Sequence, residues 1–324
     1  MMLRSTRILS GALAGLLLLL CLLAGCNREK KRVIAVVPKG RAHLFWQSVN
    51  AGAVAAARET GAEIVWNGPA SETDIPGQLQ IVETMINRRV DAIVLAPIDK
   101  TALVNVVERA AKQNIPVVIF DSGIDTDMFV SQVATDNYAA GRMAAERLGK
   151  VLNGKGKIVM VKVQPGAAST MAREQGFEDE IKEHFPGIQI ADSRYGMADF
   201  AKSLAVAENM MTAHPDLKGM FASNESSTVG AVQALKGRKS NLVLVGFDWS
   251  PTLLEDLKNG VVDSLVVQDP FRMGYESVMA AVHKLDGKPV EKIKNLPPRL
   301  VTRENLNEPD VQAQLNPDLK KYLQ

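Results

Sequence analysis

Short apolar runs rich in Val and Ile alternate with longer amphipathic segments along nearly all of this 324-residue chain. Several runs, such as Ala92-Ile93-Val94-Leu95-Ala96, are apolar on both faces. Strands of this kind belong in parallel sheets that helices cover on both sides. Strict alternation of strands and helices also favours right-handed crossovers. The sequence therefore predicts an α/β protein built from doubly wound parallel sheets.

The apolar runs form two sets, each with the number of strands that suits one small open sheet. The first set comprises Val33–Pro38, Glu63–Trp66, Asp91–Pro97, Pro116–Asp121 and Val130–Asp136. The second set comprises Gly156–Val163, Gln189–Tyr195, Gly219–Asn224, Leu242–Asp248 and Val262–Asp269. We therefore expect two similar lobes with a cleft between them, and a single ten-stranded sheet is the competing layout.

The first residues have the pattern of an export signal. Arg4 and Arg7 precede an apolar run from Gly11 to Gly25, which is shorter than the roughly 20 residues of a membrane-spanning helix. Leu23-Ala24-Gly25-Cys26 resembles the lipobox of bacterial lipoproteins, which implies cleavage before Cys26 and acylation of its thiol. An ordinary secretory signal is the alternative. We expect a lipoprotein signal peptide over 1–25, a tether over 26–32, and a lipid-anchored periplasmic or cell-surface protein.

The charge balance argues against a nucleic-acid partner. The chain has 38 basic and 36 acidic residues, and removal of residues 1–25 takes away Arg4 and Arg7 only. The remaining 36 positive and 36 negative charges offer no general attraction for phosphate groups. The roughly 300 residues that remain suggest two domains.

Polar and aromatic side chains gather where the predicted strands end, which is where open α/β sheets bind ligands. The set comprises Lys39, His43, Phe45, Trp46, Asp121, Ser122, Arg173, Asn224, Asp248 and Gln268. Carboxylates, amides and a guanidinium match the vicinal hydroxyls of a sugar, which both donate and accept. Aromatic rings match its apolar C–H face. The set predicts binding of a small neutral sugar or polyol.

Two alternatives to this interpretation stay open at this point. Phe45 and Trp46 could be a buried helix start that packs against the sheet. Asp121 and Asp248 could each cap a helix that follows a strand.

Several segments in a characteristic order carry a resemblance to a known family. They are Asp91-Ala92-Ile93-Val94-Leu95-Ala96-Pro97, Asn114-Ile115-Pro116-Val117-Val118, Ala172-Arg173-Glu174-Gln175-Gly176-Phe177, Thr212-Ala213-His214-Pro215-Asp216, Val245-Gly246-Phe247-Asp248 and Gln268-Asp269-Pro270. From about Val33 to about Pro297 the chain resembles the type I periplasmic sugar-binding proteins, most closely their ribose-binding branch. The resemblance implies the substrate-binding component of an ABC importer, which captures a monosaccharide by closure of two lobes and presents it to a membrane permease.

The resemblance also assigns roles to individual positions. It implies stacking aromatics at Phe45 and Trp46, and a further aromatic at Phe200. It implies polar ligand contacts at Asp121, Arg173, Asn224, Asp248 and Gln268. His43 stands where the family has an asparagine. Ser122 stands where the ribose-binding branch has an arginine, so the chain lacks that bidentate donor, which argues against ribose itself. Lys39 is the candidate replacement for the missing positive charge, with a solvent-facing lysine as the alternative.

Three crossings between the lobes are implied near Thr135-Asp136, Gln268-Asp269 and Leu296–Arg299, and together they form a hinge for closure. The N-terminal lobe would comprise residues 33–135 and 269–296, and the C-terminal lobe residues 136–268 and 297–302. The polar tail, residues 303–324, is interrupted by Pro309 and Pro317. We expect it to wrap the surface without a chemical role.

Motifs of other function classes argue against an enzyme. Pro38-Lys39-Gly40-Arg41-Ala42 follows the first strand in place of a dinucleotide-binding Gly-x-Gly-x-x-Gly. The four histidines lack metal-ligand spacing. We expect no catalysis, cofactor or metal, and a monomer. A sugar-responsive repressor is excluded, because an export signal replaces its DNA-binding helices. A sensory solute receptor, and a nucleoside or furanosyl signal molecule as the ligand, remain alternatives.

Overall fold

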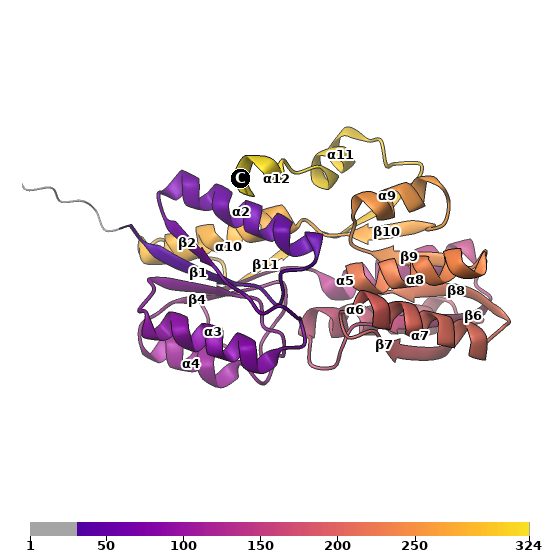
Figure 1. Ribbon diagram of the computed structural model, residues 1–324, viewed down its shortest axis with the longest axis horizontal. Helices are drawn as coiled ribbons and strands as arrows, with labels where there is room; N and C mark the ends of the chain where they lie inside the picture. Colours follow the sequence, from indigo (N-terminus) through magenta and orange to yellow (C-terminus); the bar gives the residue numbers. More distant parts are fainter. Residues whose placement is uncertain (1–30, 324) are drawn as a thin grey trace, which may run out of the picture. The chain divides into compact units, whose positions relative to one another are not determined.

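Two six-stranded sheets organise the chain in the computed structural model, which describes residues 31–323 (Figure 1). The predicted signal peptide and Cys26 lie outside the described residues. The first sheet contains β1 (Val33–Val37), β2 (Glu63–Trp66), β3 (Ala92–Leu95), β4 (Val117–Phe120), β5 (Ser131–Thr135) and β11 (Ile293–Leu296). Its helices are α2 (Leu44–Thr60), α3 (Ile75–Asn87), α4 (Val104–Lys112) and α10 (Pro270–Leu285). We call this part the N-terminal lobe.

The second sheet and its helices form the C-terminal lobe. Its strands are β6 (Gly156–Lys162), β7 (Ile188–Tyr195), β8 (Leu217–Ala222), β9 (Val243–Phe247), β10 (Ser264–Val267) and β12 (Arg299–Thr302). Its helices are α5 (Asn137–Val151), α6 (Ala168–His184), α7 (Phe200–Ala213), α8 (Glu225–Arg238) and α9 (Pro251–Lys258). Arg32 to the end of the chain clusters as one compact unit, so both lobes belong to the same body.

The two sheets share one topology. Their strand orders are β11-β5-β4-β3-β1-β2 and β12-β10-β9-β8-β6-β7, and every pair is parallel except β10 with β12. In each sheet the strand order reverses beside the first strand of the lobe, and ligands bind at such switch points. The predicted fold class is confirmed, and the single ten-stranded sheet is wrong.

Each sheet has one strand more than the sequence analysis expected. The crossing near Leu296–Arg299 connects β11 directly to β12 through two prolines. Both strands lie at sheet edges. In β11 only Leu296 is buried, so this strand carries no continuous apolar run that would reveal it.

Close helix packing at glycines fixes the helices that border the cleft. A Cβ atom on Gly52 of α2 would lie 1.9 Å from the carbonyl oxygen of Phe271 in α10. In the other lobe, a Cβ atom on Gly141 of α5 would lie 1.9 Å from the carbonyl oxygen of Arg173 in α6. Neither glycine can be replaced without separation of the two helices. These contacts set the positions of α2 and α6, which both carry predicted site residues.

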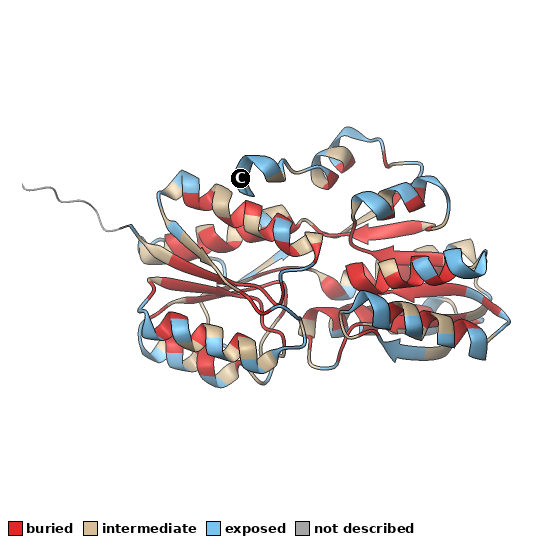
Figure 2. Ribbon diagram, viewed as in Figure 1, coloured by how far each residue is buried: buried red, intermediate tan, exposed pale blue. Residues whose placement is uncertain are grey.

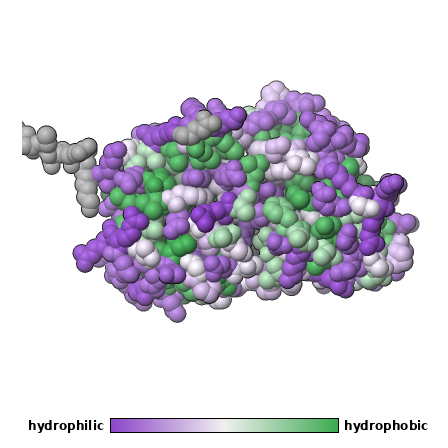
Figure 3. Space-filling view, viewed as in Figure 1, coloured by the Kyte–Doolittle hydropathy of each residue, from purple (hydrophilic) through white to green (hydrophobic). Residues whose placement is uncertain are grey.

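The central strands of both sheets are the best buried part of each lobe (Figure 2). On the face in Figure 3, charged and polar residues surround smaller apolar patches. No helix among residues 31–323 combines the length and the apolar character that a membrane crossing requires.

The tail is more than a surface wrap. Its helix α11 (Pro309–Leu315) buries Val311 and Leu315 in the core of the C-terminal lobe. Its helix α12 (Leu319–Leu323) lies on α2 of the N-terminal lobe, where Arg58 Nη1 donates to the carbonyl oxygen of Lys321 at 2.7 Å. The carboxyl-terminal segment thus contacts both lobes, which the polar sequence of the tail did not predict.

Candidate ligand-binding site

A pocket lies between the carboxyl ends of the two sheets. The N-terminal lobe lines it with Lys39, His43, Phe45, Trp46, Glu72 and Asp121, and the C-terminal lobe with Ser169, Thr170, Arg173, Asn224, Glu225, Asp248 and Gln268. The structure therefore brings most of the predicted site residues to one place. Ser122 and Phe200 are the predicted residues that do not line this pocket.

Asp121 and Asp248 occupy equivalent positions in the two lobes. Each directly follows a central strand, and each has a left-handed backbone, with φ of 59° and 65°. Such a conformation is uncommon for a residue other than glycine and often marks a functional site. The alternative that each aspartate caps the helix after its own strand is wrong. The strand β5 rather than a helix follows Asp121, and Ser250 caps the helix after β9.

The residues that each lobe contributes to the pocket form its half-site. In the N-terminal half-site, oppositely charged side chains of the same lobe pair with each other. Lys39 Nζ lies 2.6 Å from Asp121 Oδ2, and His43 Nδ1 lies 2.7 Å from Glu72 Oε1. Trp46 Nε1 also donates to Glu72 Oε1 at 2.7 Å. All of these side chains are largely buried, so each charge meets a partner inside the protein rather than water.

The pair of His43 and Glu72 is ionised at neutral pH. Burial alone would lower the pKa of His43, but Glu72 outweighs burial, with help from Glu225 and Asp248, and the pKa rises to about 9. Burial would raise the pKa of Glu72, but His43 and then Lys39 lower it overall. The half-site therefore holds an imidazolium and a carboxylate in contact.

The C-terminal half-site is arranged differently around Arg173. Its guanidinium donates through Nη1 to the carbonyl oxygen of Ser223 and through Nη2 to Asn137 Oδ1, the latter at 2.8 Å. It also lies 3.4 Å from the ring centroid of Phe247. Among residues 31–323, Arg173 Nε has no hydrogen-bond partner although it is buried. Burial lowers the pKa of Arg173, against the opposing charge of Asp248.

Asp248 is held by neutral donors. Its Oδ1 accepts from Gln268 Nε2 at 2.7 Å, and its Oδ2 accepts from the backbone N–H of Glu225 at 3.0 Å. Gln268 Oε1 in turn accepts from Thr135 Oγ1 at 2.7 Å, at a crossing between the lobes. Burial raises the pKa of Asp248, and the nearby Arg173 opposes that rise. The network fixes the Asp248 carboxylate through hydrogen bonds, and within residues 31–323 the Arg173 guanidinium makes no direct ion pair.

The lobes touch across the pocket, so this is a closed conformation. Lys39 Nζ donates to Ser169 Oγ at 3.0 Å, and the backbone N–H of Ser169 donates to Ser122 Oγ at 3.0 Å. The backbone N–H of Phe45 donates to Glu225 Oε2 at 3.2 Å. Ser122 is fully buried and contacts the opposite lobe rather than the pocket. Lys39 is buried too, so its solvent-facing alternative is wrong.

The aromatic residues divide between core and pocket. Trp46 is 3% exposed and stands edge-on to Phe120, with ring centroids 6.2 Å apart, yet it also lines the pocket. Phe45 is half-buried and stands edge-on to Trp46. Phe200 is 38% exposed and meets the His43 ring edge-on across the cleft at 5.1 Å. Trp46 therefore has two roles, since it packs in the core and also lines the pocket, whereas Phe45 faces the pocket.

The sequence analysis missed Glu72, Ser169, Thr170 and Glu225. Glu72 lies in the loop between β2 and α3, away from any strand end. Ser169 and Thr170 lie in the first turn of α6. Glu225 carried a usable signal, because it directly follows Asn224 at the end of β8. Burial, opposed by His43 and assisted by Asp248, raises the pKa of Glu225 to about 7.

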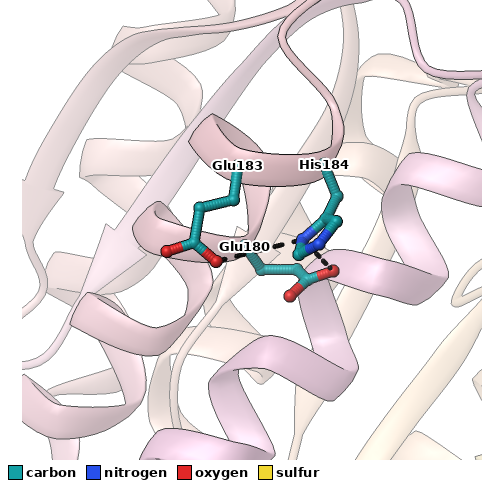
Figure 4. A group of neighbouring side chains, drawn as sticks. All are labelled: Glu180, Glu183 and His184. Atoms are coloured by element: carbon teal, nitrogen blue, oxygen red, sulfur yellow. Dashed lines mark ion pairs between the residues drawn. The ribbon is translucent and has the colours of Figure 1, made fainter.

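One group of metal-ligand side chains lies elsewhere, at the end of α6. Glu180, Glu183 and His184 point toward one another there (Figure 4). Arg142 pairs with both carboxylates, at 2.5 Å from Glu180 Oε2 and 2.9 Å from Glu183 Oε2. Arg142 already supplies the positive partner of both carboxylates, so the group does not favour a metal cation.

The comparison with known proteins places this fold in a defined class. Residues 34–289 match the periplasmic binding protein domain family. The match covers most of the chain, and the chain belongs to this family. The expected sugar-binding component of an ABC importer is confirmed at the level of the family.

Two curated relatives and two solved structures illustrate the similarity. The chain is 33% identical to the D-ribose/D-allose-binding protein of Pseudomonas aeruginosa, over 82% of this chain and 86% of the relative. It is 29% identical to the ribose import binding protein RbsB of Bacillus subtilis, over 80% and 83%. A solute-binding protein from Agrobacterium radiobacter in complex with D-arabinose has a TM-score of 0.87 and 33% identity, with coverage of 89% and 100%. A solute-binding protein from Agrobacterium vitis with bound D-fucose has a TM-score of 0.85 and 36% identity, and the alignment covers 88% of this chain and 100% of that one.

Proposed function

We propose that this protein binds one neutral monosaccharide ring between its lobes and delivers it to the permease of an ABC importer. The observation that carries this proposal is a closed pocket in which carboxylate, amide and guanidinium groups surround the half-buried Phe45. Such groups pair with vicinal hydroxyls, and an aromatic ring suits the apolar face of a sugar. The relatives named for ribose and allose, and the solved structures with arabinose and fucose, support the same ligand class.

The lining of the pocket favours a single sugar ring over a nucleoside. Phe45 and Trp46 are the apolar residues of this lining, and the other lining residues are polar or charged. A nucleobase would need more apolar surface than these two rings offer, whereas a sugar ring needs one aromatic face and many hydrogen-bond partners. Ribose is not the favoured sugar, because Ser122 lacks the guanidinium of the ribose-binding branch and Lys39 is already paired with Asp121.

Closure supplies the binding energy without a chemical step. Each neutral hydrogen bond contributes about 0.5–1.5 kcal/mol net, and bonds to charged groups contribute more. Several such bonds in a desolvated cleft reach micromolar affinity, about 8 kcal/mol, after the costs of ordering. We propose that the protein releases the same sugar that it captures, as a binding protein rather than an enzyme.

Attachment to the membrane is proposed from the sequence alone. Cys26 follows Leu23-Ala24-Gly25, and a lipid on this cysteine would keep the protein near its permease as an exported monomer. Replacement Cys26→Ser should release the protein from membranes and abolish incorporation of labelled palmitate. Incorporation that persists in the variant would contradict the anchor.

Calorimetric titration with pentoses, hexoses, inositols and nucleosides tests the ligand class. We expect at least one monosaccharide to bind with a Kd near micromolar, and Asp248→Asn to weaken it strongly. Asp256→Asn is the matched control, because Asp256 is also a buried carboxylate of the C-terminal lobe but pairs with Lys236 away from the pocket. Binding of a nucleoside but no sugar, or conversion of the sugar on incubation, would refute the proposal.

A further inference from the structure

We propose that the lobes cap each other's helices when the cleft closes: Glu225 caps α2, and Ser122 caps α6. This inference rests on the proposed function only in that closure encloses the sugar. It assigns to Glu225 and Ser122 a role in closure that is separate from contact with the ligand.

The contacts are reciprocal across the cleft. Glu225, at the start of α8, accepts from the backbone N–H groups of Leu44 and Phe45, with distances of 3.3 and 3.2 Å. Ser122, in the loop after β4, accepts through Oγ from the backbone N–H of Ser169 at 3.0 Å. Phe45 and Ser169 are the second residues of α2 and α6, where a capping side chain normally finds its donor.

Neither helix has a cap of its own. His43 precedes α2 but makes no capping hydrogen bond, because its ring is held by Glu72. Ala167 precedes α6 and has no side chain that could accept. Neither helix has an acidic residue in its first turn. By contrast, Asp136 and Ser250 cap α5 and α9 within the same lobe.

Both α2 and α6 carry residues that line the pocket. Phe45 is in the first turn of α2, and Arg173 is in α6. In an open cleft these first-turn N–H groups would face water, whereas in the closed form they meet protein acceptors. An interaction made in only one of two conformations shifts the population toward it. The two caps therefore stabilise closure and fix the start of both helices at the same time.

Charge at Glu225 adds a pH dependence to this contact. The titratable and charged groups that share the pocket with it are Lys39, His43, Glu72, Asp121, Arg173 and Asp248. Burial, opposed by His43, raises the pKa of Glu225 to about 7 in the closed form. In the open cleft water returns to the carboxyl, and its pKa moves back toward its ordinary value. Closure thus takes up a proton, and it strengthens as the pH falls through about 7.

Amide hydrogen exchange measured by NMR, without and with saturating D-arabinose, D-fucose or D-allose, tests the caps directly. In the wild type we expect protection of the Phe45 and Ser169 amides in the closed state. Glu225→Ala should speed exchange at Phe45 but not at Ser169, and Ser122→Ala should do the reverse, so each variant controls the other. Glu225→Gln keeps an amide oxygen as acceptor and should restore most of the protection at Phe45.

Affinity for the sugar provides the second readout. Each alanine variant should raise the Kd about threefold to thirtyfold, the range expected for loss of a helix cap. In the double variant the two free-energy changes should add, so the two fold-changes in Kd should multiply. Glu174→Gln, at a buried carboxylate with contacts inside its own lobe only, should leave closure unchanged.

Several outcomes would overturn the caps. A Kd that rises in Glu225→Ala while the Phe45 amide keeps its protection would mean that Glu225 contacts the sugar instead. Unprotected Phe45 and Ser169 amides in the wild type, in every state, would mean that the caps do not form. If no tested sugar binds, the proposed function fails, whereas exchange in the sugar-free protein still decides whether the caps exist.

Discussion

The two half-sites of the pocket handle their charges in opposite ways. In the N-terminal lobe each charged side chain has an oppositely charged partner, as Lys39 has Asp121 and His43 has Glu72. In the C-terminal lobe Arg173 and Asp248 are instead held by backbone and amide groups. The first arrangement neutralises itself, while the second keeps charged groups fixed and ready for a ligand. The contrast indicates that the C-terminal lobe contributes more to affinity and the N-terminal lobe more to shape.

The largest effect on affinity is expected for Asp248→Asn. The variant keeps the size of the side chain, and asparagine tolerates the left-handed backbone. Loss of the charged acceptor should cost about 3 kcal/mol of binding, roughly a hundredfold in Kd. Stability should fall by about 1–3 kcal/mol, because both oxygens of Asp248 accept hydrogen bonds and the NH2 group of asparagine would face one of these donors. Calorimetry and a thermal melt would measure both quantities, and an unchanged Kd would contradict the larger contribution of the C-terminal lobe to affinity.

The corresponding change in the other lobe, Asp121→Asn, should affect stability more than binding. It leaves the buried Lys39 without its counter-charge, which costs about 3 kcal/mol or more of unfolding free energy. The Kd should rise about tenfold. Urea unfolding would measure the loss, and the double variant with Lys39→Met should recover most of the stability, because an apolar residue needs no partner. A single variant as stable as the wild type would show that the pair is not buried in solution.

A smaller effect is expected from pH. With the pKa of Glu225 at about 7 in the closed form, the sugar should bind up to about tenfold more tightly at pH 6 than at pH 8. The gain arises as the pH falls, since the closed form holds the proton more strongly than the open form. Titrations at several pH values should show this slope in the wild type and not in Glu225→Gln. An equal slope in both proteins would assign the proton to another group.

The smallest effect on affinity is expected for Glu72→Gln, about threefold or less. Its signature is instead the pKa of His43, which should fall well below its value of about 9, because burial remains while the Glu72 carboxylate is lost. An NMR titration of the His43 ring would follow this change, with the other three histidines as internal references. A His43 pKa that stays near 9 would mean that Glu225 and Asp248, rather than Glu72, control it.

Strand periodicity predicted the two-lobed fold, and strand ends predicted most of the pocket, because parallel strands bring their carboxyl ends together. Glu72 escaped prediction because it comes from a loop that folds back over His43. The strands β11 and β12 were not predicted because each has only four residues and neither carries a continuous apolar run. Ser122 lies at the end of a strand, as expected. Its hydroxyl contacts the opposite lobe, and the sequence alone cannot show a contact between residues so far apart in the chain.

The carboxyl-terminal segment sets a mechanical limit on the hinge. With α11 embedded in one lobe and α12 lying on the other, only residues 316–318 join the two attachments. Three residues reach at most about 10–11 Å when fully extended. A wider swing would peel α12 from the surface of α2, so the end of the chain acts as a restraining strap whose detachment would report how far the protein has opened.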